Sequence, residues 1–288
     1  FPFCKTGCSS AEEQPVLPKG NNLSLHLLEL FTSQVAKVGM TDGIRQVLQE
    51  ESDALRAYYE QAGILIARPA GGTSCRLAIS AKGGTNAENH NHNDVGSYAV
   101  ALGSETMVGD QGGPNSYPGD YFNGDAPQKY KIKGSFGHPV PVVDGRTQSS
   151  GGKAKGVVLQ KEFTNEKDVF SIDYTSAYST PNLDKLIRTF VYDRQGEGNF
   201  TVGDEFTAKT PIRFETAITT RADWKILDDT HLLLATDSEQ MIVAIDASGK
   251  VVFTSETIEV NSPAYTRIGI ALKNQSKEGY IRLKMYTK

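Results

Sequence analysis

The most constraining feature of the sequence is a series of short apolar segments with a period of two, which begins near Gly63 and continues to the C-terminus. Such alternation is typical of half-buried β-strands. The segments follow one another at roughly 8- to 12-residue intervals without helices between them, which indicates an antiparallel β-sandwich. We therefore predict a mainly β fold. The expected strands are 64–66, 75–80, 98–102, 157–163, 169–174, 186–192, 213–219, 232–235, 241–245, 251–253, 267–272 and 280–285.

Two short amphipathic α-helices are expected before the first strand. Apolar residues recur at intervals of three or four over 27–38. Asp42 is a favourable N-cap for a second helix, whose apolar face includes Tyr58 or Tyr59. Two helices of this length do not form a domain alone, so they are expected to pack on the rest of this chain or on a segment outside it.

The composition limits what the chain binds. Its 288 residues are 38% hydrophobic and 22% charged, which suffices for a substantial core. No stretch approaches the roughly 18 to 20 uninterrupted apolar residues of a membrane helix, so no membrane span is expected. The net charge of −4 argues against a nucleic-acid partner bound by bulk electrostatics. We divide the chain into an irregular lead with terminal helices over 1–62 and a β-sandwich over 63–288.

One segment interrupts the strand pattern. Residues 109–156 are rich in Gly, Pro, Asp, Asn and Tyr, and a loop of this length inside a compact β domain is usually functional or mobile. The segment contains three alternating lysines, Lys129, Lys131 and Lys133. A solvated strand face is the ordinary interpretation of such lysines, and a stripe that faces an anionic sugar is the alternative.

The cysteines give little information. Cys4, Cys8 and Cys75 are too few for a disulfide framework in a chain of this length. The three-residue gap between Cys4 and Cys8 is not a usual metal-ligand spacing. Incidental thiols and a single bridge both remain open.

Two of the five histidines, His90 and His92, lie two residues apart in the stretch His-Asn-His-Asn-Asp. In an extended segment they project from one face, and two imidazoles together are half of a metal site. The remaining ligands must come from elsewhere. Asp110 and His138 follow in the same order along the chain, at the start of the long segment and within it.

The neighbours of the histidine pair distinguish between families of metalloenzymes. Metallo-β-lactamase-type hydrolases require a His directly after the Asp, whereas Asp94 is followed by Val95. Cupins have a Gly before the pair, as Gly84 is here, and a Glu a few residues after it, which this sequence lacks. The sequence therefore matches only half of the cupin motif.

A third pattern accounts for more of the sequence. His-x-His-x-Asp-x-Gly-Ser-Tyr is followed by Gly-Asp-x-Gly, a loop with tyrosines, and Gly-His-x-Val-x-Val-Asp-Gly. In this order the elements resemble the C-terminal domain of the heparinase II/III-like polysaccharide lyases, over about residues 63–220. The matching residues are His90, His92, Asp94, Gly96, Ser97, Tyr98, Asp110, Gly112, His138, Val140, Val142, Asp144 and Gly145, and the strand Arg213–Ala217 also fits.

The resemblance implies an architecture and a metal site. Members of this family join an N-terminal α/α toroid to a C-terminal antiparallel β-sandwich, with the polysaccharide cleft between them. The two predicted helices would then be the end of a toroid. His92, Asp110 and His138 match the positions that hold a zinc ion, which is thought to be mainly structural. Two imidazoles and a carboxylate suit Zn²⁺.

The resemblance also implies a reaction, β-elimination on a uronic-acid polysaccharide. A base removes the proton at C5 beside the carboxylate, whose charge must be neutralised, and an acid protonates the leaving oxygen at C4. His90 matches a catalytic cleft histidine. Tyr121 is the second catalytic candidate, and Tyr117 is expected to bind substrate along the cleft.

The partners follow from the same resemblance. They are an acidic polysaccharide or oligosaccharide and a helical domain absent from this chain, without which we expect poor turnover. The location implied is the bacterial periplasm or the cell exterior. Two other functions remain open: a carbohydrate-binding or structural β-sandwich that keeps zinc without catalysis, and a cupin-like metalloenzyme.

Overall fold

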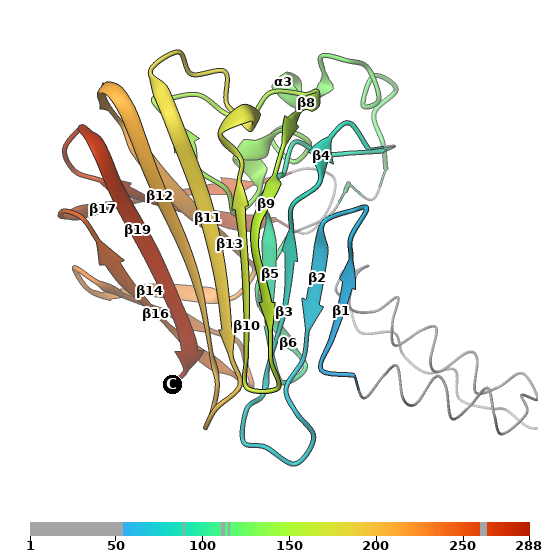
Figure 1. The fold of residues 1–288 in the computed structure, drawn as a ribbon, viewed down its shortest axis with the longest axis vertical. Coiled ribbons are helices and arrows are strands. Elements are labelled where there is room, and N and C mark those ends of the chain that lie inside the picture. The colour runs from blue at the N-terminus through green and yellow to red at the C-terminus, as the bar shows by residue number, and fades with distance from the viewer. Residues whose placement is uncertain (1–53, 89, 111–112, 115, 260–263) are drawn as a thin grey trace, which may run out of the picture.

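The computed structural model describes residues 54–288 apart from 89, 111–112, 115 and 260–263, and these residues form a two-layer β-sandwich (Figure 1). One layer is an eight-stranded sheet, and five- and four-stranded sheets make up the other. All strand pairs are antiparallel. The mainly β prediction is therefore confirmed for this part of the chain.

The eight-stranded sheet contains the longest strands. Its spatial order is β14-β15-β16-β19-β12-β11-β10-β9. The bounds are β9 Val157–Phe163, β10 Lys167–Asp173, β11 Leu183–Asp193, β12 Asn199–Ile212, β14 Asp223–Asp228, β15 His231–Ala235, β16 Gln240–Ala247 and β19 Ser276–Thr287.

The two smaller sheets lie side by side in the second layer. The five-stranded sheet, in spatial order, comprises β1 Arg56–Tyr59, β2 Ile64–Ala67, β3 Leu77–Lys82, β5 Tyr98–Leu102 and β6 Glu105–Val108. The four-stranded sheet comprises β17 Val251–Ile258, β18 Tyr265–Leu272, β13 Phe214–Thr220 and β7 Val142–Val143. The Gly109 amide donates to the Thr219 carbonyl at 3.0 Å, which joins the end of β6 to β13.

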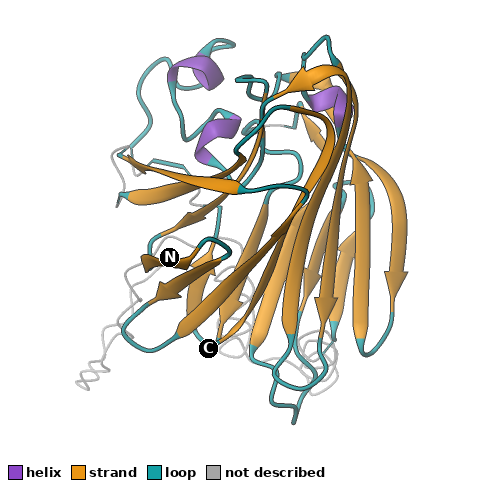
Figure 2. Ribbon diagram, turned by 90° about the vertical axis from the view of Figure 1, so that its left-hand side faces the viewer, coloured by secondary structure: helices purple, strands orange, loops and turns teal. Residues whose placement is uncertain are grey.

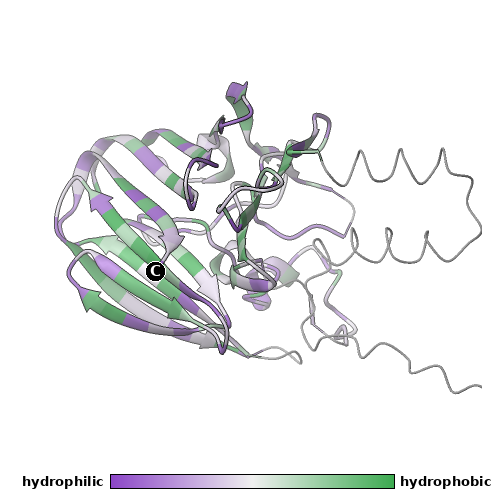
Figure 3. Ribbon diagram, turned by 90° about the horizontal axis from the view of Figure 1, so that it is seen from below, coloured by the Kyte–Doolittle hydropathy of each residue, from purple (hydrophilic) through white to green (hydrophobic). Residues whose placement is uncertain are grey.

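The core lies between the layers and is rich in aromatic rings. Phe170, Phe190 and Phe200, from three neighbouring strands of the large sheet, stack at centroid distances of 5.9 and 6.2 Å. Tyr98 of β5 packs against two of these rings from the opposite layer. Figure 3 shows apolar residues along the strands of both layers. Burial of this alternating apolar face is the main force that holds the two layers together.

The described residues of the long segment 109–156 gather at one end of the sandwich, where the short helices lie (Figure 2). It contains α3 Ala126–Lys129, the 3₁₀ turn η1 Ser135–Gly137, β7 and β8 Gly151–Lys155. β8 pairs with β4 Thr85–Asn86, and a further 3₁₀ turn, η2, spans Thr175–Ala177. This end of the molecule also contains the predicted site residues.

The second predicted helix is wrong over its last residues. Arg56–Tyr59 is a strand, paired with β2. Tyr58 packs edge-to-face on Phe163 and Phe170, at 5.7 and 5.8 Å between centroids, so tertiary packing overrides the helical spacing here. The predicted boundary between 62 and 63 falls inside this hairpin. The rest of both predicted helices lies outside the described residues.

Each of the twelve expected strands overlaps an observed strand. The sequence analysis missed β1, β4, β6, β7, β8, β12 and β14. Cys75 is buried as a free thiol, and Cys4 and Cys8 lie outside the described residues. Among the described helices, none has the length and apolar character needed to cross a membrane.

Candidate functional site

Three of the predicted site residues converge although they are far apart in sequence. His92 lies between β4 and β5, Asp110 follows β6, and His138 follows η1. One ligand atom from each lies within 4.8 Å of the others. The residues to which the resemblance assigned zinc therefore form a compact group, as a shared ion requires.

Within this group, His138 has the surroundings that most favour a cation. Its ring is 1% exposed, and Nε2 donates a hydrogen bond of 2.9 Å to the Ile132 carbonyl. Nδ1 lies 3.2 Å from Oδ2 of Asp110 without a well-formed hydrogen bond. In the neutral ring a lone pair on Nδ1 thus faces a carboxylate, an arrangement that a proton or a metal ion would relieve.

The pKa of His138 reflects the same environment. Burial is the largest single influence and lowers the pKa of this ring, but the interactions with the Asp110 and Asp94 carboxylates together outweigh burial, so the pKa lies above its usual value. The position between Nδ1 and the carboxylate therefore favours positive charge. A divalent ion would supply that charge without requiring protonation.

His92 has the opposite tendency. Its ring lies 5.2 Å from that of His138, between centroids, and Nε2 lies 3.1 Å from the hydroxyl of Tyr121. Burial, His138 and nearby lysines together lower the pKa of His92 to about 4. The ring is therefore neutral near pH 7, as a metal ligand must be. When Nε2 donates to Tyr121, Nδ1 remains free to accept.

These donors fit a zinc ion. Two neutral imidazoles and one carboxylate, with a further position left for water or another ligand, are a common zinc-binding set. The partly buried positions of His92 and Asp110 leave the group accessible. His92, Asp110 and His138 would hold the ion, and its charge would fix the three chain segments relative to one another.

Metal content is the direct measurement of this site. We expect the purified chain to bind close to one equivalent of zinc, and His92→Ala to reduce that amount severalfold or more because one of three protein ligands is removed. Elemental analysis after dialysis checks both values. His231→Ala is the matched control, since His231 of β15 is a partly exposed histidine paired with Asp228 of β14. Zinc content unchanged in His92→Ala would contradict the assignment.

A buried arginine ties together the two histidine-bearing segments. Arg188 of β11 is fully buried, and its Nη1 donates at 2.7 Å to the carbonyls of Gly96 and Pro139. Gly96 follows His92 by four residues and Pro139 follows His138 directly. The arginine in turn forms a two-bond ion pair with Asp204, at 2.7 and 2.6 Å. The large sheet thus positions the site through one side chain.

Buried side-chain amides also hold the loop that carries His90 and His92. The Gln148 side chain accepts from Asn86 at 2.9 Å and from the Val95 amide at 3.1 Å, and donates to the Val95 carbonyl at 2.7 Å. Asn86 in turn accepts from the amide of Asp94. Asp94 forms an ion pair with Lys82, and burial raises the pKa of Asp94. The loop conformation is therefore specified by hydrogen bonds rather than by strand pairing.

The expectation that His90 and His92 share one strand face is wrong. Residues 90–92 are not part of a strand, and His90 has φ of 58°, a left-handed conformation in a turn. The His90 ring is exposed and contacts Phe122 at 5.2 Å between centroids, away from the candidate metal ligands. The two histidines therefore lie in different places, His92 among the candidate metal ligands and His90 against Phe122.

His90 lies in the wall of a polar pocket of about 370 Å³. The wall combines the side chains of four asparagines, Lys133 and the ring of Phe122. The asparagines are Asn86, Asn91, Asn93 and Asn123. Amides and an ammonium group beside an aromatic ring are suited to the hydroxyl and acidic groups of a sugar.

The two tyrosine candidates form an aromatic cluster with Phe122 of the pocket wall. The Tyr121 ring lies about as close to Tyr117 as to Phe122, at 5.1 and 5.5 Å between centroids. Tyr121 is 1% exposed, and burial raises its pKa. Tyr117 is 56% exposed. A protonated Tyr121 that contacts His92 is placed to support that ring, whereas Tyr117 faces solvent.

Two residues of this region were missed as site residues by the sequence analysis. Phe122 contacts His90, and Arg188 anchors both histidine segments. Nothing in the spacing of a strand residue such as Arg188 indicates that its charge is buried. A third residue, Lys133, was noted only as part of the lysine alternation, and it lines the pocket.

Comparisons with known proteins identify the fold. No protein-family model matches the sequence, and curated proteins give no significant match. Among solved structures, heparinase III matches with a TM-score of 0.64 and 17% identity, over 81% of this chain and 36% of that one. The described sandwich shares the fold of part of heparinase III. This confirms, at the level of fold, the resemblance to heparinase-like lyases.

A second neighbour gives the same result. The heparan sulfate lyase HepC from Pedobacter heparinus matches with a TM-score of 0.69 and 14% identity, over 91% of this chain. The chain spans 42% of the length of HepC and 36% of that of heparinase III. These low identities show a common fold and leave the activity of this chain to be established.

Proposed function

We infer that this chain is the zinc-containing sandwich of a polysaccharide lyase that cleaves a uronic-acid glycan by β-elimination. The observation that carries the proposal is the position of a His90-lined polar pocket beside the compact group of His92, Asp110 and His138. The shared fold with heparinase III and a heparan sulfate lyase supports a lyase over a cupin-like enzyme. An acidic glycan, such as heparan sulfate, is the proposed substrate.

The proposed mechanism gives the pocket two tasks. It must hold the uronate carboxylate so that its negative charge is neutralised as C5 loses its proton, and it must transfer protons at C5 and at the C4 oxygen. His90 is exposed in the pocket wall and is the proposed proton-transfer group. The amides of Asn91 and Asn123 are the proposed hydrogen-bond donors to the carboxylate as charge develops. The amides of Asn86 and Asn93 already donate both of their hydrogens within the protein.

Tyr121 suits a different role from that of a base. Burial raises the pKa of its hydroxyl, so Tyr121 is protonated near pH 7 and can donate but not accept a proton. Its hydroxyl also lies at His92 rather than in the pocket wall. We therefore propose His90 as the main catalytic group of this chain and keep Tyr121 as a candidate proton donor. A zinc ion, when bound, would fix the segments that carry these residues.

The test is the appearance of unsaturated uronate, followed by its ultraviolet absorbance, when heparan sulfate or alginate is added to the full polypeptide that contains this chain. We expect His90→Ala to lower kcat by roughly 10²- to 10⁴-fold, because general acid–base groups contribute that much. His231→Ala is the control. The 288-residue chain alone is expected to turn over poorly, and vigorous turnover by it would refute the need for a helical domain.

A non-catalytic glycan-binding sandwich is the second candidate. The polar pocket and the buried, hydrogen-bonded state of Tyr121 are compatible with binding alone. Saturable glycan binding by the full polypeptide without any unsaturated product would favour this function and contradict the lyase.

A further inference from the structure

Lys133 is a buried ammonium group without a carboxylate partner in the described part of the chain. The residue is 7% exposed. Its Nζ donates to the Tyr121 carbonyl and lies 4.8 and 5.0 Å from the ring centroids of Tyr121 and Phe122. An ammonium group has three donors, so one carbonyl leaves two of them for another acceptor. Burial lowers the pKa of Lys133, as expected for a cation that no nearby acid compensates.

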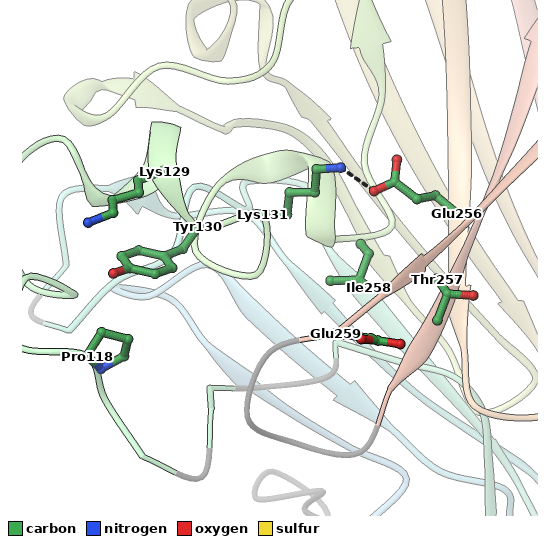
Figure 4. Close-up of a pocket in the computed structure, with 8 residues that line it drawn as sticks. All are labelled: Pro118, Lys129, Tyr130, Lys131, Glu256, Thr257, Ile258 and Glu259. Carbon is green, nitrogen blue, oxygen red and sulfur yellow. Dashed lines mark hydrogen bonds and ion pairs between the residues drawn. The ribbon is translucent and has the colours of Figure 1, made fainter.

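The two other lysines of the alternating set provide the contrast. Lys129 forms an ion pair with Asp120. Lys131 forms one with Glu256, which Figure 4 shows. Both are exposed and lie in the wall of a separate pocket. The three lysines do not form one strand face, because α3 and the turns after it separate their directions. The lysine that lacks an acid is the one in the wall of the His90 pocket.

The surroundings of Lys133 favour an acidic ligand. The amides of Asn91 and Asn123 lie in the same wall, and the Asn91 amide keeps one of its two hydrogens after its bond to the His92 carbonyl. The Asn93 amide, also in this wall, already donates to the Gln148 carbonyl and the Ser150 hydroxyl. Glu88, the acid in this wall, is exposed and accepts a hydrogen bond from Thr85 at 2.8 Å. A buried cation left uncompensated is costly, and a ligand carboxylate or sulfate would remove that cost with charge-assisted hydrogen bonds.

We propose that Lys133 is the residue that recognises the acidic group of the sugar in the His90 pocket and thereby gives the pocket its preference for acidic over neutral sugars. This inference rests on the proposed function, because that function places the sugar in the His90 pocket. The role of Lys133 is tested by measuring sugar binding, which requires no turnover. The acidic group is a carboxylate or a sulfate, since both accept several hydrogen bonds from an ammonium group and amides.

The experiment measures the binding of single sugars to the 288-residue chain by ligand-observed NMR. The probes are glucuronate, glucosamine 6-sulfate and neutral glucose. We expect glucuronate or the sulfated sugar to bind about tenfold more tightly than glucose, which is the contribution of a hydrogen bond to a charged group. The acid that binds more tightly identifies the source of the anion. In Lys133→Met we expect this preference to be lost, and in Lys133→Arg we expect it to be retained in part.

Two further variants keep the result interpretable. Lys129→Met removes an exposed, ion-paired lysine outside the pocket and should leave binding unchanged. Asn123→Trp changes an exposed wall residue, so it should block the pocket without a buried defect even if Lys133→Met fails to fold. Equal affinity for acidic and neutral sugars, an acid preference that persists in Lys133→Met, or full binding in Asn123→Trp would each overturn the proposal. None of these outcomes depends on whether the full polypeptide forms unsaturated product.

Discussion

Asp204→Ala is expected to lower the free energy of unfolding by about 3 to 5 kcal/mol, the usual cost of removing one partner of a buried ion pair. Arg188 and Asp204 are 0% and 1% exposed. Asp204 also accepts hydrogen bonds from Tyr174 at 2.6 Å and from Thr216 at 2.7 Å. The substitution therefore leaves a buried guanidinium without its carboxylate and two hydroxyls without their acceptor.

Urea denaturation of the described sandwich measures this change. The next residue of the same strand offers the matched control, because Glu205 pairs with Arg282 at 2.7 Å on the exposed face. Glu205→Ala should change the free energy of unfolding by less than about 1 kcal/mol. Similar losses in the two variants would show that burial does not set the strength of the Asp204 pair.

The ion pair of Arg188 and Asp204 also links the core to the site. Because Arg188 donates to the carbonyls of Gly96 and Pro139, disturbance of its ion pair should loosen both histidine segments. Asp204→Asn, which preserves side-chain size, is expected to weaken zinc binding even where the chain remains folded. The large sheet is thus part of the functional architecture, although none of its strands carries a candidate metal ligand.

The architecture was predictable because the core strands alternate clearly. Val157–Phe163 and Tyr98–Leu102 were predicted with the bounds that the structure has. The longest strand, Asn199–Ile212, was missed because Gly203 and Asp204 interrupt its apolar alternation. The sequence does not reveal that Asp204 is buried against Arg188, since that pairing is formed only by the tertiary fold. Strand prediction from local apolar alternation fails where a charged residue occupies a core position.

The candidate site was predictable in its membership but not in its geometry. The order of His92, Asp110 and His138 along the chain was sufficient to group them, and the structure brings them together. The conformation of His90 was not predictable, because its positive φ depends on hydrogen bonds around the loop rather than on strand alternation. The unpaired state of Lys133 depends in the same way on where the acids of other segments lie.

Of the ligands proposed for this chain, zinc is the one whose removal we expect to lower the stability of the folded state most. A metal that binds only the folded state adds RT ln(1 + [Zn]/Kd), about 4 kcal/mol when free zinc is a thousand times Kd. For a chain of this size such a change corresponds to a rise in Tm of roughly 10 °C. Thermal unfolding followed by circular dichroism, with and without a chelator, measures the difference.

His138→Ala should abolish this zinc-dependent difference. Two separate effects are expected, because His138 is both a candidate ligand and a buried ring bonded to the Ile132 carbonyl. Loss of the ring lowers Tm even in the chelated protein, through a cavity and an unpaired carbonyl. Loss of the ligand removes the response to zinc. The decisive quantity is therefore the zinc-dependent shift within each variant, which His231→Ala should retain in full. A His138→Ala chain that still gains the full shift would place any bound zinc elsewhere.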